Sequence, residues 1–124
     1  MHKILTILLL IIIGIGNAYS SEDYNIITDI NIAKAEAVKT KTNLLLIFTD
    51  DACIPCGKLK KEIERNIDEE ISKKYTVCYV DYSTNPELAK QYEVRQIPYS
   101  VVIEKNKAYV GFREYSQYKK WLEL

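Results

Sequence analysis

The chain has 124 residues with 17 basic and 17 acidic side chains, so its formal net charge at pH 7 is zero. This balance gives no reason to expect nucleic acid or another polyanion as a partner. Three cysteines are too few for a disulfide-framed scaffold. The single histidine, His2, lies in a segment that we expect to be removed, which excludes His-assisted nucleophiles and most catalytic zinc sites. We therefore expect no metal and no other cofactor.

The first 20 residues are predicted to be a signal peptide. Lys3 supplies a positive charge, residues 4–15 are almost continuously apolar, and the small residues that follow fit cleavage after Ala18 or Ser20. The apolar run is shorter than the roughly 20 residues that a transmembrane helix needs. The chain is therefore expected in the periplasm or otherwise outside the cytoplasm, and an uncleaved membrane anchor is the alternative.

Residues 21–124 are long enough for one compact domain and too short for two. A first helix is predicted to begin after Thr28 or Asp29, either of which can cap it, and to continue to about Lys39. Apolar residues recur at helical spacing within it, at Ile32, Ala35 and Val38. This spacing supports the helix.

The next segment contains the residues that we expect to react. The apolar residues 44–49 predict a buried strand, and Cys53-Ile54-Pro55-Cys56 follows it directly. After this motif, apolar residues recur at every fourth position and predict a helix, at Leu59, Ile63 and Ile67. Cys53 would lie at the helix N-terminus, where free N–H groups and the positive end of the dipole stabilise a thiolate. A C-x-x-C pair in this setting indicates redox chemistry, with Cys53 as nucleophile and Cys56 as resolving cysteine.

Two other interpretations of the motif carry no redox chemistry. In the first, the two cysteines are half of a zinc site. Structural zinc takes four Cys or His ligands, however, and only Cys78 and His2 could complete the set. In the second, the two cysteines form a static structural disulfide. Such a disulfide would close too short a loop to stabilise the fold much. Cys78 itself is expected to be a small buried hydrophobe.

The second half of the chain alternates between strands and helices in the same way. Asn85 and Pro86 fit a helix cap followed by proline at the first helical position. Predicted strands cover residues 76–82, 99–104 and 108–112, and predicted helices cover 68–74, 86–92 and the segment from Ser116 onward. The last two strands are close enough to form a hairpin. The order α-β-α-β-α-β-β-α predicts a single α/β domain in which helices cover a central sheet.

Over almost all of residues 21–124 the chain resembles the thioredoxin family. The resemblance rests on the strand before the motif, on the motif itself, on the run from Asn85 to Pro98, and on the terminal hairpin and helix. It implies a thioredoxin fold with a central mixed β-sheet flanked by helices. It also implies that Pro98 is cis and faces the CxxC pair, and that Ile97 offers backbone hydrogen bonds to an extended partner. Ile97 and Pro98 are therefore the candidate substrate-binding residues.

The chain departs from the family at two positions. Ile47 stands where thioredoxins usually carry a buried acid that moves protons, and Ala52 stands where they carry a tryptophan. Proton transfer is then expected to use water, or Asp50 or Asp51. Trp121, the only tryptophan, is predicted to pack the last helix onto the sheet.

These observations predict an extracytoplasmic thiol:disulfide oxidoreductase that acts on partner-protein disulfides as a reductant. Ile54 and Pro55 bring no charge that would stabilise the thiolate, unlike the histidine of the family's oxidising members. A reductant in an oxidising compartment needs an electron source, which we expect to be a membrane protein. We expect a monomer without a nucleic-acid partner. The alternatives are an oxidase or isomerase of exported proteins, and a non-catalytic binding module on a thioredoxin fold.

Overall fold

The structure is a computed structural model that describes residues 26–124. The predicted signal peptide and the start of the predicted domain lie outside the described residues. Within residues 26–124, no helix has the length and apolar character that crossing a membrane would require.

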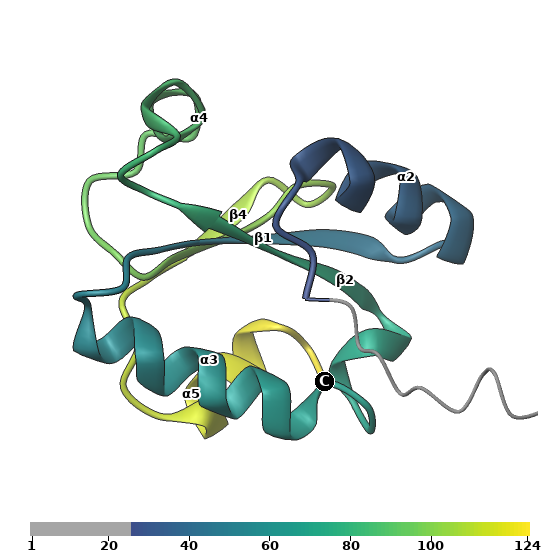
Figure 1. Ribbon diagram of the computed structural model, residues 1–124. Coiled ribbons are helices and arrows are strands. Elements are labelled where there is room, and N and C mark those ends of the chain that lie inside the picture. Colours follow the sequence, from purple (N-terminus) through teal and green to yellow (C-terminus); the bar gives the residue numbers. More distant parts are fainter. Residues whose placement is uncertain (1–25) are drawn as a thin grey trace, which may run out of the picture.

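Helices and strands alternate in the predicted order (Figure 1). The described elements are α2 (Ile30–Thr40), β1 (Asn43–Thr49), α3 (Ile54–Asn66), the 3₁₀ helix η2 (Ile71–Lys73), β2 (Tyr75–Asp81), α4 (Pro86–Gln91), β3 (Tyr99–Val102), β4 (Lys107–Val110) and α5 (Tyr115–Trp121). The segment predicted as a helical continuation over residues 68–74 forms only the short 3₁₀ helix η2.

The four described strands form one mixed sheet in the order β2-β1-β3-β4. β1 pairs with β2 in parallel, whereas β3 is antiparallel to both β1 and β4. A parallel pair needs a crossover connection, and α3 with η2 supplies it. Figure 1 shows α3 and α5 on one face of the sheet and α2 and α4 on the other. This arrangement confirms the predicted sheet covered on both sides by helices.

β1 is an interior strand of the sheet and is buried on both faces. Leu45 and Ile47 belong to the core that contains α3 and α5, whereas Leu44, Leu46 and Phe48 belong to the core that contains α2 and α4. Successive side chains of a strand point to opposite faces, so both sets need cover. The uninterrupted apolar run of β1 is typical of a strand between two helical layers.

The first helix is present as predicted, and alanines form its buried face. Ala33 and Ala37 contact the sheet and are 0% and 4% exposed, whereas Ile32 and Val38 are 59% and 81% exposed. Ala33 and Ala37 are four residues apart and lie on one side of the helix. Their small side chains let α2 approach the sheet closely, whereas the larger apolar side chains of the helix stay largely in solvent. Asp29 rather than Thr28 caps the helix.

Candidate active site

A tight turn carries the chain from the end of β1 into α3. Asp50 holds this turn through two hydrogen bonds: its side chain accepts from the N–H of Ala52 at 3.0 Å, and its carbonyl accepts from the N–H of Cys53 at 3.1 Å. Cys53 keeps an extended backbone and is the N-cap of α3. Pro55 fits the first helical turn because an N–H there has no intrahelical partner. The predicted strand-to-helix junction is therefore present at the motif.

The two cysteines of the motif are joined by a disulfide, and their Cα atoms are 5.2 Å apart. The N–H of Cys56 also donates a hydrogen bond to the sulfur of Cys53 at 3.2 Å. Their exposure differs, because Cys53 is partly exposed and Cys56 is only 1% exposed. Ile54 beside Cys53 is 75% exposed. An incoming partner can therefore reach the sulfur of Cys53 but not that of Cys56.

The peptide bond between Ile97 and Pro98 is cis, the geometry that the resemblance implies. Pro98 is fully buried, and its carbonyl accepts a hydrogen bond from the N–H of Gly111 at 2.8 Å. The backbone N–H and C=O of Ile97 make no hydrogen bond to another residue of the described part of the chain. Pro55 and Ile97 line the same cleft, so the structure brings the CxxC motif and the proline segment together.

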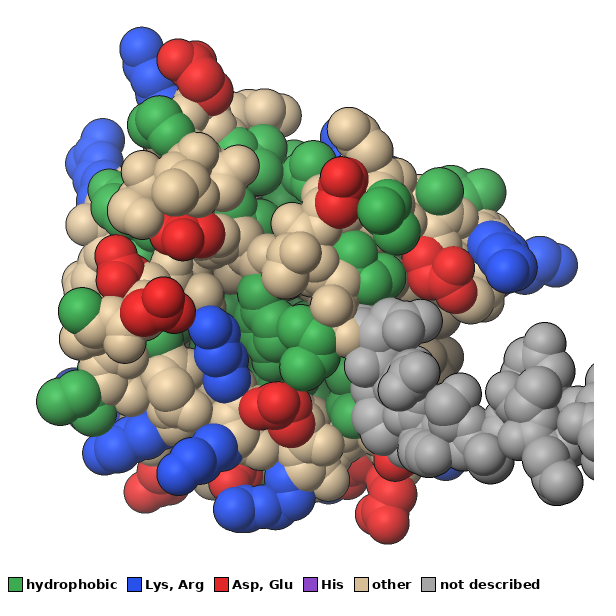
Figure 2. Space-filling view, in the orientation of Figure 1, with side chains coloured by type: hydrophobic (Ala, Val, Ile, Leu, Met, Phe, Trp, Pro, Cys, Tyr) green, Lys and Arg blue, Asp and Glu red, His purple; other side chains and the backbone are tan. Residues whose placement is uncertain are grey.

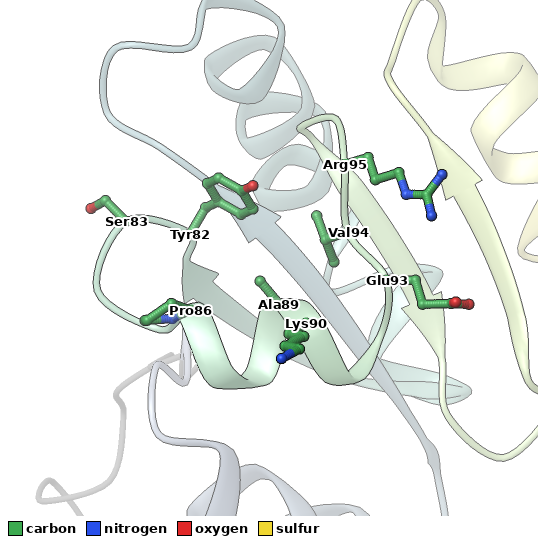
Figure 3. A pocket seen from close by; sticks show the side chains of 8 residues that line it. All are labelled: Tyr82, Ser83, Pro86, Ala89, Lys90, Glu93, Val94 and Arg95. Atoms are coloured by element: carbon green, nitrogen blue, oxygen red, sulfur yellow. The ribbon is translucent and has the colours of Figure 1, made fainter.

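Two hollows lie along the segment formed by residues 94–97. The first is the cleft shared by Pro55 and Ile97, with a volume of about 460 Å³, and the segment from Tyr109 to Arg113 forms its other wall. The second has a volume of about 690 Å³ and lies beside α4. Figure 3 shows the ring of Tyr82, Ala89 of α4 and Val94 converging on this second hollow. Polar side chains complete its lining: Ser83, Lys90, Glu93 and Arg95.

The two departures from the family pattern have clear structural positions. Ile47 is fully buried on the α3 face of the sheet, so an apolar side chain occupies the place of the usual acid. Ala52 is exposed in the turn before Cys53. Trp121 packs against Tyr109 and Tyr118, with ring centroids 5.4 and 5.5 Å apart. The tryptophan therefore belongs to the packing of α5 on the sheet, as predicted.

The third cysteine lies away from the motif. Cys78 is fully buried in β2, and burial, with a smaller contribution from Asp29, raises the pKa of its thiol to about 11. The thiol is therefore protonated at neutral pH and unreactive. Within residues 26–124, no three His, Cys, Asp or Glu side chains are grouped so that they could hold a metal ion.

Comparison with known proteins shows which family has this architecture. Residues 30–124 match the family described as thioredoxin-like domain. Three solved thioredoxins are similar in structure. The germline-specific thioredoxin Deadhead of Drosophila melanogaster has a TM-score of 0.64 and 20% identity, and the match covers 81% of this chain and 98% of that one. Chloroplastic thioredoxin z has a TM-score of 0.62 and 24% identity, covering 78% and 88%. A mutant thioredoxin of Halobacterium salinarum has a TM-score of 0.60 and 23% identity, covering 79% and 85%. None of the curated proteins compared with the chain matches it.

The chain therefore belongs to the thioredoxin-like domain family and has the thioredoxin fold. Within this family, an intact CxxC pair at the N-terminus of α3 makes the protein a thiol:disulfide oxidoreductase. Both conclusions confirm what the sequence predicted.

Proposed function

We propose that the protein reduces disulfides of partner proteins, with Cys53 as the nucleophile and Cys56 as the resolving cysteine. The observation that carries this proposal is the unequal setting of the two sulfurs. The sulfur of Cys53 is reachable and accepts a backbone N–H from the first helical turn, whereas Cys56 is 1% exposed. Hydrogen bonds and the positive end of the helix dipole favour the thiolate over the thiol.

The reaction has two steps. The Cys53 thiolate attacks one sulfur of the partner's disulfide, the partner's second sulfur leaves as a thiolate, and a mixed disulfide forms. Cys56 then loses its proton and attacks the sulfur of Cys53, which releases the partner's remaining sulfur. The partner gains two electrons and two protons, and the protein is left with the Cys53–Cys56 disulfide.

The segment ending in Ile97 and Pro98 is suited to hold the partner chain. Because the N–H and C=O of Ile97 have no partner among the described residues, they can pair with an extended segment as a sheet edge does. The cleft that Ile97 shares with Pro55 can accept a side chain next to the partner's cysteine. The face shown in Figure 2 mixes acidic and basic side chains, which suits a protein partner better than a polyanion.

The direction of electron flow follows from the charges at the motif. Ile54 and Pro55 add no positive charge that would stabilise the reduced form, and Asp50 and Asp51 precede the motif in sequence. A less stabilised thiolate makes the dithiol a better electron donor. We propose a reductant on this ground; an oxidase or isomerase would use the same two cysteines in the same order.

The predicted signal peptide supports a place outside the cytoplasm, and a reductant there needs a donor, for which we propose a membrane protein. We also propose that the protein acts as a monomer. Intact-mass analysis of the exported protein tests the first point, because cleavage after Ala18 or Ser20 predicts two defined masses. A mass that retains residues 1–15 would mean a membrane-tethered enzyme instead.

Turnover decides between the proposed enzyme and a non-catalytic binding module. Insulin reduction with dithiothreitol as electron source should proceed with the wild-type protein and be abolished in Cys53→Ser. The double variant Cys53→Ser/Cys56→Ser serves as the background. No turnover above that background in the wild type would favour the binding module.

A further inference from the structure

Lysines line a hollow at the edge of the sheet where β1 and β2 begin. The hollow has a volume of about 360 Å³, and its lining includes one carboxylate, that of Glu123, and four exposed lysines: Lys41, Lys73, Lys74 and Lys105. Lys41 follows α2, the next two lysines lie between the end of η2 and the start of β2, and Lys105 lies in the turn between β3 and β4. Segments far apart in the chain therefore bring positive charge to one place, which we call the basic hollow.

The positive charge of the basic hollow is only partly balanced. The carboxylate of Glu123 forms ion pairs with Lys105 and with one further lysine outside the lining. The Nζ of Lys74 donates to the backbone carbonyl of Glu123 at 2.9 Å, a group that carries no net charge. Lys41 and Lys73 form no ion pair with another residue in the described part of the chain. Because the whole chain has a formal net charge of zero, this excess of lysine is a local separation of charge.

An exposed apolar side chain lies close to these lysines in the chain. Val38 is in the last turn of α2, three residues before Lys41, and is 81% exposed. Figure 2 shows apolar side chains over α2 and basic side chains at its end. Lys41 itself has a left-handed backbone, with a φ of 58°, a conformation that favours glycine at the end of a helix. Basic and apolar side chains next to each other suit the boundary between the headgroups and the acyl chains of a lipid bilayer.

The basic hollow lies at the opposite end of the sheet from the redox pair. β1 begins at the hollow with Asn43 and ends at Thr49, just before the turn to Cys53. The seven residues of β1, at about 3.3 Å each, place these two ends roughly 20 Å apart. Figure 1 shows the start of β2 and the start of α3 at opposite ends of the domain. A surface bound to the hollow therefore leaves Cys53 free to meet partner proteins.

The described chain begins beside the same end of the sheet. Ile27 forms a parallel bridge with Cys78 in β2, so Ile26 lies on the side of this bridge where β2 begins. Residues 4–15, which precede them in the chain, are almost continuously apolar. A signal peptide or an anchor brings the chain to a membrane in either case. A lipid surface is therefore an available occupant for the basic hollow.

We propose that the basic hollow docks the domain on a membrane that contains anionic lipids. The ammonium groups of the lysines contact the phosphates of the headgroups, and Val38 enters the interface beside them. Each lysine near an anionic surface strengthens binding about fivefold, or by about 1 kcal/mol. The attraction weakens as added salt screens it. The inference rests on charge and exposure, and it does not depend on the redox reaction.

Lysine footprinting tests the docking. The exported protein is mixed with vesicles of phosphatidylglycerol and phosphatidylcholine, or of phosphatidylcholine alone, and its free amines are acetylated briefly. Mass spectrometry then gives the labelling rate at each lysine. We expect slower labelling of Lys41, Lys73 and Lys74 on the anionic vesicles only. Lys58 and Lys61 of α3, which are exposed but do not line the basic hollow, should be labelled at an unchanged rate. The comparison between the two kinds of vesicle holds whether or not the exported protein keeps its apolar segment.

A matched pair of double variants shows whether the lysines of the hollow are responsible. Lys41→Gly/Lys73→Gln removes two charges from the lining, and glycine fits the left-handed backbone of position 41. The equilibrium constant for docking, measured by protection of Lys74, should fall about 25-fold in this variant. Lys58→Gln/Lys61→Gln changes the total charge by the same amount and should leave that constant unchanged.

Two further variants and two soluble anions separate a lipid surface from other ligands. Val38→Asn should weaken docking on the anionic vesicles severalfold, and Glu123→Gln, which removes the carboxylate from the lining, should strengthen it. Equal protection by inorganic phosphate or by RNA would assign the hollow to another ligand and overturn the inference. Equal protection on the neutral vesicles, or an equal loss in Lys58→Gln/Lys61→Gln, would overturn it as well. Insulin turnover should be the same in all these variants; a wild-type protein that docks without turnover would refute the proposed function and support this inference alone.

Discussion

The backbone N–H of Cys56 donates a hydrogen bond to the sulfur of Cys53 across 3.2 Å, the contact that an N-cap side chain makes with the third residue of its helix. A thiolate accepts such a bond better than a thiol does, so the contact favours negative charge on Cys53. Cys56 lies inside the first turn and is 1% exposed. The two cysteines of the motif therefore have different chemical tasks.

The order of attack can be tested by trapping. Cys56→Ser should accumulate mixed disulfides through Cys53, because the first step proceeds and the resolving sulfur is missing. Cys53→Ser should trap almost none, since the remaining sulfur is buried. Non-reducing electrophoresis of cell extracts, followed by mass spectrometry of the linked peptides, measures both. Equal trapping by the two variants would contradict the assignment.

The residues between the cysteines should set the reduction potential. With no positive charge there, we expect a potential nearer about −270 mV, a value typical of thioredoxin, than about −120 mV, typical of a strong oxidant. Pro55→His would add a charge that stabilises the Cys53 thiolate and hence the dithiol. We expect this variant to raise the potential by at least about 30 mV, which is about tenfold in the equilibrium constant.

Equilibration with a glutathione buffer, followed by alkylation of free thiols, gives the reduction potentials of the wild-type protein and of Pro55→His. Pro55→Gln is the matched control, because it also removes the proline and adds a polar side chain without charge. The reduction potential of Pro55→His should exceed that of Pro55→Gln, and this difference should become smaller above the pKa of the new imidazole. A wild-type value at the oxidising end would refute the reductant and favour the oxidase.

Much of the fold could be predicted because its signals are local. The apolar run of β1 and the fourfold spacing of Leu59, Ile63 and Ile67 each depend on neighbours in the chain. The buried face of α2 could not be predicted in this way. Ala33 and Ala37 carry little hydrophobic signal, and only the close approach of α2 to the sheet makes them the buried residues.

The candidate site likewise has features that follow from the local sequence and features that do not. The CxxC pair and its place at a helix N-terminus follow from the strand before it and the helix after it. The contact between the Lys60 ammonium group and the Tyr79 ring, 5.3 Å from its centre, does not, since it depends on how α3 packs against β2. Lys60 belongs to a run of lysines in α3 and is partly buried over the Tyr79 ring.

Two buried tyrosines should respond differently to loss of their hydroxyl groups. The hydroxyl of Tyr118 donates to that of Ser100 at 2.7 Å, and both residues are fully buried. Tyr118→Phe removes this bond and leaves the Ser100 hydroxyl unpaired, which should lower the free energy of unfolding by about 1–3 kcal/mol. Tyr79→Phe loses no hydrogen bond to another described residue, so the free energy of unfolding should stay the same or increase.

Urea denaturation of the reduced proteins measures both changes. The double variant Tyr118→Phe/Ser100→Ala is the control, because it removes both hydroxyl groups and leaves neither unpaired. We expect it to recover part of the loss seen in Tyr118→Phe. A loss in Tyr79→Phe as large as that in Tyr118→Phe would show that the Tyr79 hydroxyl has a stabilising partner and would contradict the prediction.

The carboxylate of Glu123 should make stability depend on pH in acid. The Nζ atoms of Lys107 and Lys105 lie 2.9 and 3.1 Å from its Oε2 atom. Together the two lysines lower the pKa of Glu123 from 4.5 to about 2. A pKa that is lower in the folded state means that the ionised form is stabilised by folding. This contribution is complete above the unfolded value, near 4.5, and is lost as the pH falls through the folded value, near 2.

Glu123→Gln should therefore lower the melting temperature slightly at pH 7, and the difference from wild type should vanish as the pH falls from 4.5 towards 2. The effect is small because the Glu123 side chain is 60% exposed, where salt screens ion pairs. Added salt should reduce the difference at pH 7 as well. Glu69→Gln, at an exposed carboxylate without an ion pair in the described structure, should show no such dependence. A difference for Glu123→Gln that persisted at pH 2 would show that packing of the side chain, rather than its charge, is what the substitution disturbs.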